Sequence, residues 1–336
     1  MLRLLALLIA CLALSAPATA REPRPLKIAR QGSFFIGGQD VQSDTLGEIK
    51  PFPQSGHVTV DQVYVRYQIP VRARRAAMVL LHGCCLTGVS WETTPDGRAG
   101  WDEWFVRAGH PVYVMDQAWR GRSAIDVTAI NAVRDGRRPP SALPVATAAS
   151  RETAWRIFRF GPAYGETYPG LQFPVEAQEG LWQQMVPNFA RDGDEPSPTI
   201  AALQLLGERI GRAVIVSHSQ SGIYPFEAAL RGGASVAGIV AIEPASCPAP
   251  DRDLSSLRGI PVLVLFGDYV AQSDRWAPRR EACARFVEAA RADGVRVELV
   301  DLPAFGIRGN SHMMMQDRNS HDVAAVIDRW LRGHGL

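Results

Sequence analysis

Short apolar runs alternate with helix-like segments along most of the chain. The runs are AAMVLLHG, HPVYVMDQ, RAVIVSHS, VAGIVAIEP, PVLVLFGD and VRVELVDLP, between positions 76 and 303. Segments such as TIAALQLLGERIG and REACARFVEAARADG, which lie between the runs, have the spacing of amphipathic helices. Strands that are apolar along their whole length are typical of a parallel sheet covered by helices on both faces. The pattern therefore predicts an α/β fold with a mostly parallel sheet.

Two earlier segments have a different pattern. GSFFIGG (32–38) and HVTVDQVYVRYQIPV (57–71) are rich in β-branched and aromatic residues, and the second alternates apolar with polar residues. This period of two indicates strands with one exposed face. We therefore expect both segments at an edge of the sheet.

The segment from about 123 to 198 interrupts the alternation. It is rich in prolines and glycines and carries many large side chains: Trp155, Phe158, Phe160, Tyr164, Tyr168, Phe173, Trp182 and Met185. Long connections in compact domains are commonly functional. The segment predicts an inserted cap or lid over a site, and an irregular packed excursion is the alternative.

The first 20 residues, MLRLLALLIACLALSAPATA, have the composition of a secretory signal. A head with Arg3 precedes an apolar run, and small residues at 18–20 end it. A membrane anchor is the alternative, but the apolar run is short for a span of about 20 residues. No later stretch is apolar enough to cross a bilayer. We expect cleavage after Ala20, a periplasmic or secreted protein without a membrane anchor, and a single α/β domain over residues 21–336.

The mature chain keeps four cysteines, Cys84, Cys85, Cys247 and Cys283, because Cys11 lies in the signal. An even number in an oxidising compartment indicates disulfides, and four cysteines allow three pairings. Zinc sites favour CxxC spacing or nearby histidine pairs, which this sequence lacks. We therefore expect no metal site.

A serine, an acid and a histidine follow successive strands in that chain order. The serine is Ser219, in RAVIVSHSQSG, a strand followed at once by a helix. A sharp strand-to-helix turn needs small residues two positions before and two after its central residue. Ser217 and Ser221 meet this need in place of the two glycines of the usual G-x-S-x-G pattern. Ser219 is therefore the predicted nucleophile, and an ordinary serine-rich turn is the alternative.

A catalytic base is expected in the loop after the last strand, where the sequence is PAFGIRGNSHMMMQ. His312 lies in this loop, whereas His321 begins the final amphipathic helix. His82 and His218 adjoin the proposed site, but neither occupies the position expected of the base. We predict that His312 is the base; a solvated loop histidine is the alternative.

The acid has two candidates. It usually follows the second strand after the nucleophile, in a turn like G-x-x-D, but Val270 occupies that position here. Asp268 in the same turn could substitute for it. Glu243 ends the preceding strand, where its carboxylate could reach the histidine, or it could form a structural salt bridge.

Four motifs, HGCCLTG, SHSQSG, AIEP and GNSHM, together resemble a small family of secreted bacterial esterases of the α/β-hydrolase fold. The resemblance covers most of the mature chain, and HGCCLTG is its most distinctive motif. It implies Ser219 as nucleophile, Glu243 as acid and His312 as base. It further implies that the amides of Cys84 and Gln220 bind the oxyanion, and it suggests a homodimer, which the sequence itself does not show.

The resemblance also implies a pairing of the cysteines. In that family two adjacent cysteines form a disulfide beside the oxyanion hole, here Cys84 with Cys85, which leaves Cys247 with Cys283. Adjacent Cα atoms lie about 3.8 Å apart across a trans peptide, below the usual range for a disulfide. The bond would therefore close a strained ring that fixes the loop. Long-range pairing of each with Cys247 and Cys283 is the alternative.

These residues predict hydrolysis of a small-molecule carboxylic ester through an acyl-enzyme. His312 would take the proton of Ser219, and Glu243 would orient and stabilise the imidazolium. No cofactor is implied, and 36 basic against 34 acidic residues do not indicate a nucleic-acid partner. The same groups could cleave an amide, a lactone or a polyester. An inactive ligand-binding homologue and a periplasmic redox sensor built on the cysteine pair are further alternatives.

Overall fold

The structure is a computed structural model and describes residues 24–73, 75–190, 196–232 and 235–336. The predicted signal, residues 1–20, lies outside the described residues, as does its cleavage site. In the part that is described, no helix has the length and apolar character needed to cross a membrane.

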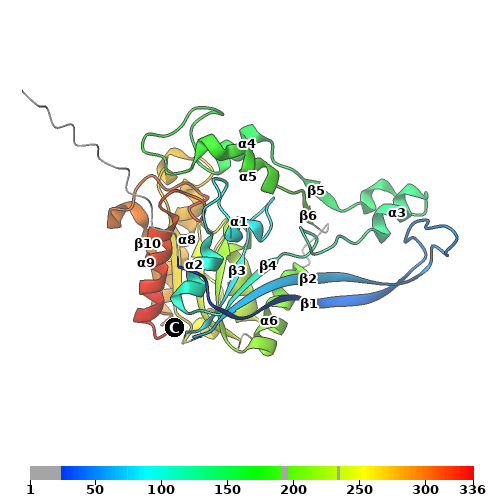
Figure 1. Cartoon of the computed structure of the whole chain (residues 1–336), viewed down its shortest axis with the longest axis horizontal. Coiled ribbons are helices and arrows are strands. Elements are labelled where there is room, and N and C mark those ends of the chain that lie inside the picture. The colour runs from blue at the N-terminus through cyan, green and yellow to red at the C-terminus, as the bar shows by residue number, and fades with distance from the viewer. Residues whose placement is uncertain (1–23, 74, 191–195, 233–234) are drawn as a thin grey trace, which may run out of the picture.

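Eight strands form one sheet in the order β1-β2-β4-β3-β7-β8-β9-β10 (Figure 1). The strands are β1 (Ile28–Ser43), β2 (Gly56–Pro70), β3 (Ala77–Leu81), β4 (Val112–Asp116), β7 (Ala213–His218), β8 (Val236–Ile242), β9 (Val262–Phe266) and β10 (Val297–Asp301). The neighbours from β4 to β10 pair in parallel, whereas β1 with β2 and β2 with β4 pair antiparallel. A mostly parallel sheet built from the six apolar runs confirms the predicted fold class.

The two early strands are longer than the rest and form a hairpin that projects from the body (Figure 1). β1 is an edge strand, as expected. β2 is not, because it also pairs with β4 through the register Tyr64 to Asp116. The side chains at Val63 and Val65 are fully buried, so the alternation marks one buried face rather than an edge position.

Helices cover both faces of the sheet. On one face, α6 (Pro198–Ile210), α7 (Tyr224–Leu230) and α8 (Ala277–Ala292) share a core cluster with the sheet. On the other, α2 (Trp101–Ala108) packs against α9 (Ser320–Gly333), and their apolar side chains join a second cluster. Neighbouring residues of β7 divide between the clusters: Ile215 belongs to the first and Val216 to the second. Burial on both faces is the reason why the strands are apolar throughout.

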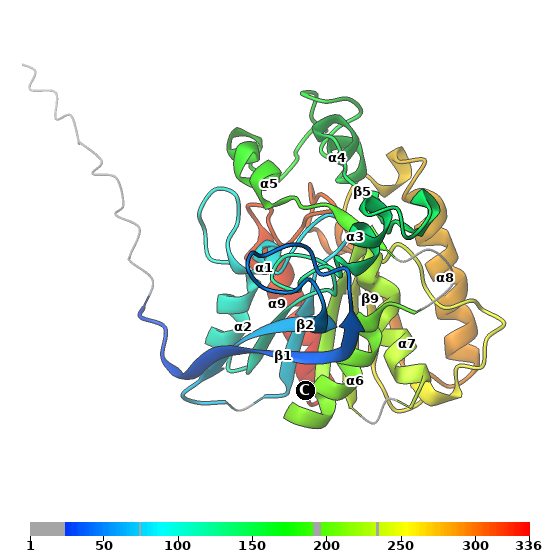
Figure 2. The same ribbon diagram turned by 90° about the vertical axis from the view of Figure 1, so that its right-hand side faces the viewer.

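The segment between β4 and α6 contains α3 (Thr128–Arg134), β5 (Val145–Thr147), α4 (Arg151–Ile157), α5 (Gln178–Gln184) and β6 (Asn188–Ala190). The short strands β5 and β6 pair with each other as a separate two-stranded sheet. Figures 1 and 2 both show α4 and α5 at the top of the molecule, beyond the main sheet. The segment contacts the loops that follow the strands, because His312 N donates to Phe158 O and Val186 N donates to Cys85 O. Part of the segment therefore lies against the residues expected to form the site.

Candidate active site

The turn after β7 contains Ser219, the first residue of a 3-10 turn, Ser219–Ile223, that leads into α7. Its φ is 57°, in the left-handed region that a side chain with a Cβ rarely adopts. Such strain is typical of functional positions that the surrounding fold holds in place. Gly222 gives the turn room, because a Cβ there would lie 2.4 Å from Cβ of Pro244. Ser219 is partly exposed and therefore accessible from solvent.

The serines that replace the two usual glycines are both fully buried. The hydroxyl of Ser221 accepts a hydrogen bond from His218 N at 3.1 Å and lies 3.0 Å from the carbonyl oxygens of Leu81 and His218. Leu81 is the last residue of β3, so this hydroxyl links the turn to the neighbouring strand. The second serine is thus small enough for the turn and also adds a contact that glycine could not make.

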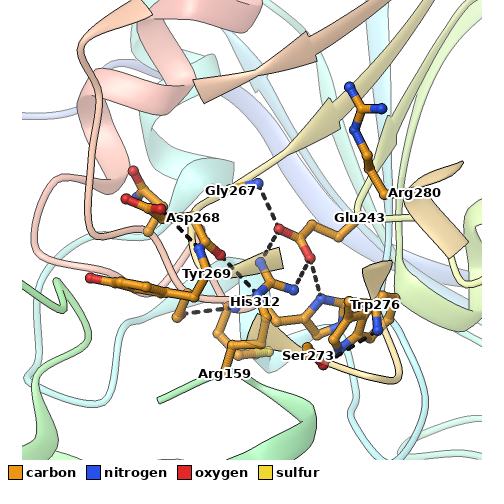
Figure 3. A network of polar contacts seen from close by, with 12 residues as sticks. Arg159, Glu243, Gly267, Asp268, Tyr269, Ser273, Trp276, Arg280 and His312 are labelled. Carbon is orange, nitrogen blue, oxygen red and sulfur yellow. Dashed lines mark hydrogen bonds and ion pairs between the residues drawn. The ribbon is translucent and has the colours of Figure 1, made fainter. Parts of the chain in front are cut away.

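Glu243 follows β8 directly and is fully buried, with a φ of 46°. Its Oε1 accepts from Gly267 N at 2.7 Å and its Oε2 lies 2.8 Å from Nδ1 of His312. Both oxygens also accept from the guanidinium of Arg159 (Figure 3). Burial alone would raise the pKa of Glu243, but the Arg159 charge and the His312 hydrogen bond outweigh it and lower the pKa to about 2. The carboxylate is therefore ionised across the physiological range.

The His312 ring is fully buried. It lies between aromatic groups, with centroids 4.1 Å from Trp276 and 6.0 Å from Phe158. Its Nε2 has no hydrogen-bond partner among the described residues. Burial lowers the pKa of His312 to about 4 although Glu243 opposes this effect, so the ring is neutral near pH 7. A neutral imidazole whose Nδ1 is held by a carboxylate presents Nε2 as a free acceptor.

The candidate acid Glu243 and the candidate base His312 lie close to the turn that contains Ser219. His218, which directly precedes Ser219, has its ring 4.5 Å from the His312 ring, and its Nε2 donates to His312 O at 2.9 Å. This bond occupies one nitrogen of His218 with a backbone contact. The structure thus brings Glu243 and His312 into direct contact beside the turn of Ser219.

The carboxylate of Asp268 does not bond to Nδ1 of His312, which is held by Glu243. Its Oδ1 accepts from Tyr269 N at 2.9 Å and its Oδ2 accepts from Gly309 N at 3.0 Å, while its own N donates to Asn310 O. Asp268 therefore braces the start of the His312 loop. In the same turn the backbone N–H of Gly267 donates to Glu243, so the turn that usually carries the acid here supports the glutamate of the neighbouring strand.

The loop after β3 lies against the nucleophile turn. A Cβ on Gly83 would lie 2.8 Å from Cβ of Ser219, so only glycine permits this approach. His82 Nε2 accepts from Gln117 N at 3.0 Å, which leaves its Nδ1 to donate to Gly83 O at 2.8 Å. This bond fixes the plane of the peptide between Gly83 and Cys84. The direction of the Cys84 N–H is fixed with it.

The cysteine pair differs from expectation. Cys84 and Cys85 are free cysteines whose sulfur atoms lie 2.7 Å apart, longer than a disulfide bond of about 2.05 Å. Cys85 has a φ of 61°, and this left-handed conformation brings the sulfurs of adjacent residues together. The hydrogen bond between the thiols and burial raise the pKa of Cys84, whereas that hydrogen bond lowers the pKa of Cys85 to about 7. The structure does not contain the vicinal disulfide, which stays a prediction.

A disulfide links Cys247, in the loop after β8, to the buried Cys283 of α8, with Cα atoms 5.2 Å apart. This pairing is the one expected from the sequence. The disulfide ties the segment that follows Glu243 to α8, the helix that begins directly after Trp276. No group of three or more histidine, cysteine, aspartate or glutamate residues suited to a metal ion occurs in the described part of the chain.

Arg159 contacts the candidate acid, and no sequence pattern revealed it. It lies just after α4, is 1% exposed, and forms an ion pair with Glu243. Its position in an aromatic-rich insertion gives no local motif. A solitary arginine at the end of a helix resembles the many surface arginines of this chain, so only the three-dimensional contact identifies it.

Comparisons with known proteins show which proteins the chain is similar to. No family model matches the chain. A curated relative, the probable secreted lipase phiG of a fungal species (strain ATCC 74256), is 27% identical over an alignment of length 331, and the match covers 80% of this chain and 85% of that protein. A solved structure described as a novel bacterial esterase is 52% identical, covers 93% of this chain and 98% of the other, and superposes with a TM-score of 0.90. The chain therefore belongs to the same α/β-hydrolase family as this bacterial esterase.

Proposed function

We propose that the protein is a secreted serine hydrolase that cleaves carboxylic esters of small molecules through an acyl-enzyme. The observation that carries the proposal is the pair formed by Glu243 and His312, in which Nδ1 is held at 2.8 Å and Nε2 has no partner among the described residues. This arrangement lies beside the strained turn of Ser219. The two relatives are named an esterase and a lipase, and both names denote enzymes that hydrolyse esters.

In the proposed reaction, His312 Nε2 accepts the proton of Ser219 as its oxygen attacks the ester carbonyl. Glu243 stabilises the imidazolium that forms, and its low pKa keeps it from taking the proton itself. The amides of Cys84 and Gln220 bind the oxyanion, which in similar sites contributes roughly 3–4 kcal/mol per donor. His312 then gives the proton of Ser219 to the leaving alcohol as the ester C–O bond breaks and the acyl-enzyme forms. In the second half, His312 takes a proton from water as the water oxygen attacks the acyl carbonyl, and it returns that proton to Ser219 as the carboxylic acid leaves.

Covalent labelling tests this function directly. A fluorophosphonate should modify the protein, and mass spectrometry of the digested product should locate the adduct on the peptide that contains Ser219. An inactive ligand-binding homologue or a redox sensor would not react. A panel of esters that vary in acyl and alcohol groups, with matched amides, lactones and a polyester, then separates the alternative substrates.

The pH dependence of kcat/KM provides a second prediction. The reaction needs neutral His312, whose pKa burial lowers to about 4, so activity should persist at pH 5 and be lost as the pH falls through about 4. The measurement is the acid limb of the pH–rate profile with an ester whose own hydrolysis is slow there. An acid limb near pH 6.5 or above would contradict the buried, neutral base.

The cysteine pair gives a third prediction. If Cys84 and Cys85 are bonded in the secreted protein, the unreduced peptide holding LHGCCLTG should be about two mass units lighter than its reduced form. Reduction should then lower kcat more than it raises KM, because a loosened oxyanion donor acts mainly on the transition state. A cross-link from this peptide to Cys247 or Cys283 would contradict both the prediction and the disulfide of the structure.

Export is also part of the proposal. The signal-like first 20 residues predict it, and the disulfide between Cys247 and Cys283 is typical of an oxidising compartment. The fungal relative is named as secreted. Detection of the protein in the periplasm or medium, with its mature N-terminus after Ala20, would test this part. The homodimer implied by the resemblance is tested by the mass of the purified protein in solution.

A further inference from the structure

Three consecutive residues at the end of α4 attach the inserted segment to the proposed triad. Ile157 O accepts from Trp276 Nε1 at 2.6 Å, and Trp276 is the ring that packs on His312. Phe158 O accepts from His312 N at 2.8 Å, and the Phe158 ring stacks on the same imidazole. Arg159 then turns inward with a left-handed φ of 57°. The inserted segment is thus fixed at this point to the candidate base and its aromatic support.

The guanidinium of Arg159 uses all three of its nitrogens. Its two terminal nitrogens each donate to a different oxygen of Glu243, and its Nε donates to Asp268 O at 2.9 Å (Figure 3). Both side chains of the ion pair are fully shielded from solvent. A two-point contact between a planar guanidinium and a carboxylate fixes the rotation of the carboxylate as well as its charge. One oxygen of Glu243 is therefore kept facing His312.

We propose that Arg159 is a positioning residue that holds Glu243 ionised and aligned with His312, so that the inserted segment completes the catalytic apparatus. This inference rests on the proposed triad of Ser219, Glu243 and His312. It assigns a function to a residue of the insertion, which for this part is a fixed support rather than a movable lid.

The position of the acid explains why such a residue is needed. Glu243 comes from β8 and not from the turn after β9, and its side chain has one more rotatable bond than an aspartate. A buried carboxylate without a partner would also take up a proton. Arg159 and Gly267 N together supply the missing restraint, while Asp268 links Arg159 to the loop that carries His312.

The charge of Arg159 has a kinetic consequence. A proton that binds to the pair of His312 and Glu243 inactivates the enzyme whichever of the two holds it, and a fixed positive charge beside the pair opposes that proton. The other titratable and charged groups around the His312 ring and its loop are His218 at the end of β7, Asp268 after β9, Arg275 before α8 and Asp317 further along the loop. Arg159 donates to the Glu243 carboxylate, whereas none of these four groups forms a hydrogen bond to it within the described part of the chain.

The test compares Arg159→Met, which removes the charge, with Arg159→Lys, which keeps it but lacks the planar fork. With Arg159→Met we expect the acid limb of kcat/KM to move to higher pH by about one to two units. We also expect kcat to fall about 100-fold, because the acid is no longer held in place. With Arg159→Lys the acid limb should stay near its wild-type position while kcat falls. Arg280→Met is the matched control, since the side chain of Arg280 pairs with Asp301 and not with Glu243, so its loss should leave both quantities unchanged.

Addition of guanidinium provides an independent readout. Guanidinium chloride at low, non-denaturing concentration should restore activity to Arg159→Ala, whereas urea, which has a similar shape and no charge, should not. Circular dichroism and thermal melting establish which variants fold. If Arg159→Met does not fold, a reduced kcat with an unmoved acid limb in folded Arg159→Lys supports the proposal.

Two results would overturn the inference. One is a folded Arg159→Met enzyme with the acid limb and kcat of the wild type; the other is an Arg159→Lys enzyme with full kcat. Failure of the proposed function gives a different result, because a wild-type protein that neither hydrolyses esters nor reacts with a fluorophosphonate would refute the triad itself.

Discussion

Replacement of Ser219 by alanine is expected to lower kcat for ester hydrolysis by about 10⁶-fold, the effect of removing the nucleophile of subtilisin, and to abolish fluorophosphonate labelling. The reason is that no acyl-enzyme can form without the serine oxygen. The fold should persist, because the substitution removes a single oxygen from a partly exposed side chain. The measurements are turnover with an activated ester, labelling, and thermal melting.

Ser217→Ala is the matched control for this experiment. Ser217 lies two residues earlier, near the end of β7, and is fully buried, and its hydroxyl has no hydrogen-bond partner among the described residues. Its loss should therefore leave labelling intact. If Ser217→Ala abolished labelling while Ser219→Ala retained it, the nucleophile would be misassigned by two positions.

Replacement of Glu243 by glutamine should lower kcat by about 10⁴-fold, the effect seen when a triad acid loses its charge. Glutamine keeps the shape of the side chain but cannot stabilise the imidazolium of His312 as it forms. It also leaves the Arg159 charge without its counter-ion, so the melting temperature should fall. Turnover is therefore measured at a temperature at which circular dichroism shows the variant to be folded.

Asp268→Asn is the comparison that separates the two candidate acids. Asp268 accepts from Tyr269 N and Gly309 N and makes no contact with His312 Nδ1, which is bonded to Glu243. Its loss should loosen the His312 loop and reduce kcat far less than Glu243→Gln does. A folded, inactive Asp268→Asn enzyme beside a nearly active Glu243→Gln enzyme would reverse the assignment.

The sequence by itself was sufficient for the fold class. Runs such as AAMVLLHG and PVLVLFGD are apolar at nearly every position, and a strand buried on both faces needs that pattern. The order of the groups at the strand ends was also accessible, because a parallel sheet brings its carboxyl ends to one edge. Ser219 and His312 could be proposed from this rule and from small residues around a sharp turn, but these left Glu243 and Asp268 as two candidates for the acid. The choice of Glu243 came from the resemblance of the motifs to a known family. The pairing of Cys247 with Cys283 likewise agrees with expectation.

Other features depended on contacts between distant parts of the chain. Arg159 lies 84 positions from Glu243, and the hydroxyl of Ser221 lies 140 positions from Leu81. A local sequence pattern reports the periodicity of a segment and the residues of its turns. An ion pair between two distant segments changes neither of these, so it cannot be predicted from them. β2 was placed at an edge for the same reason, since its pairing with β4 is invisible in its own alternation. The sequence thus determined which strands exist and which polar residues follow their carboxyl ends. Only the tertiary structure decided which buried charges pair, because that pairing depends on how an irregular insertion packs.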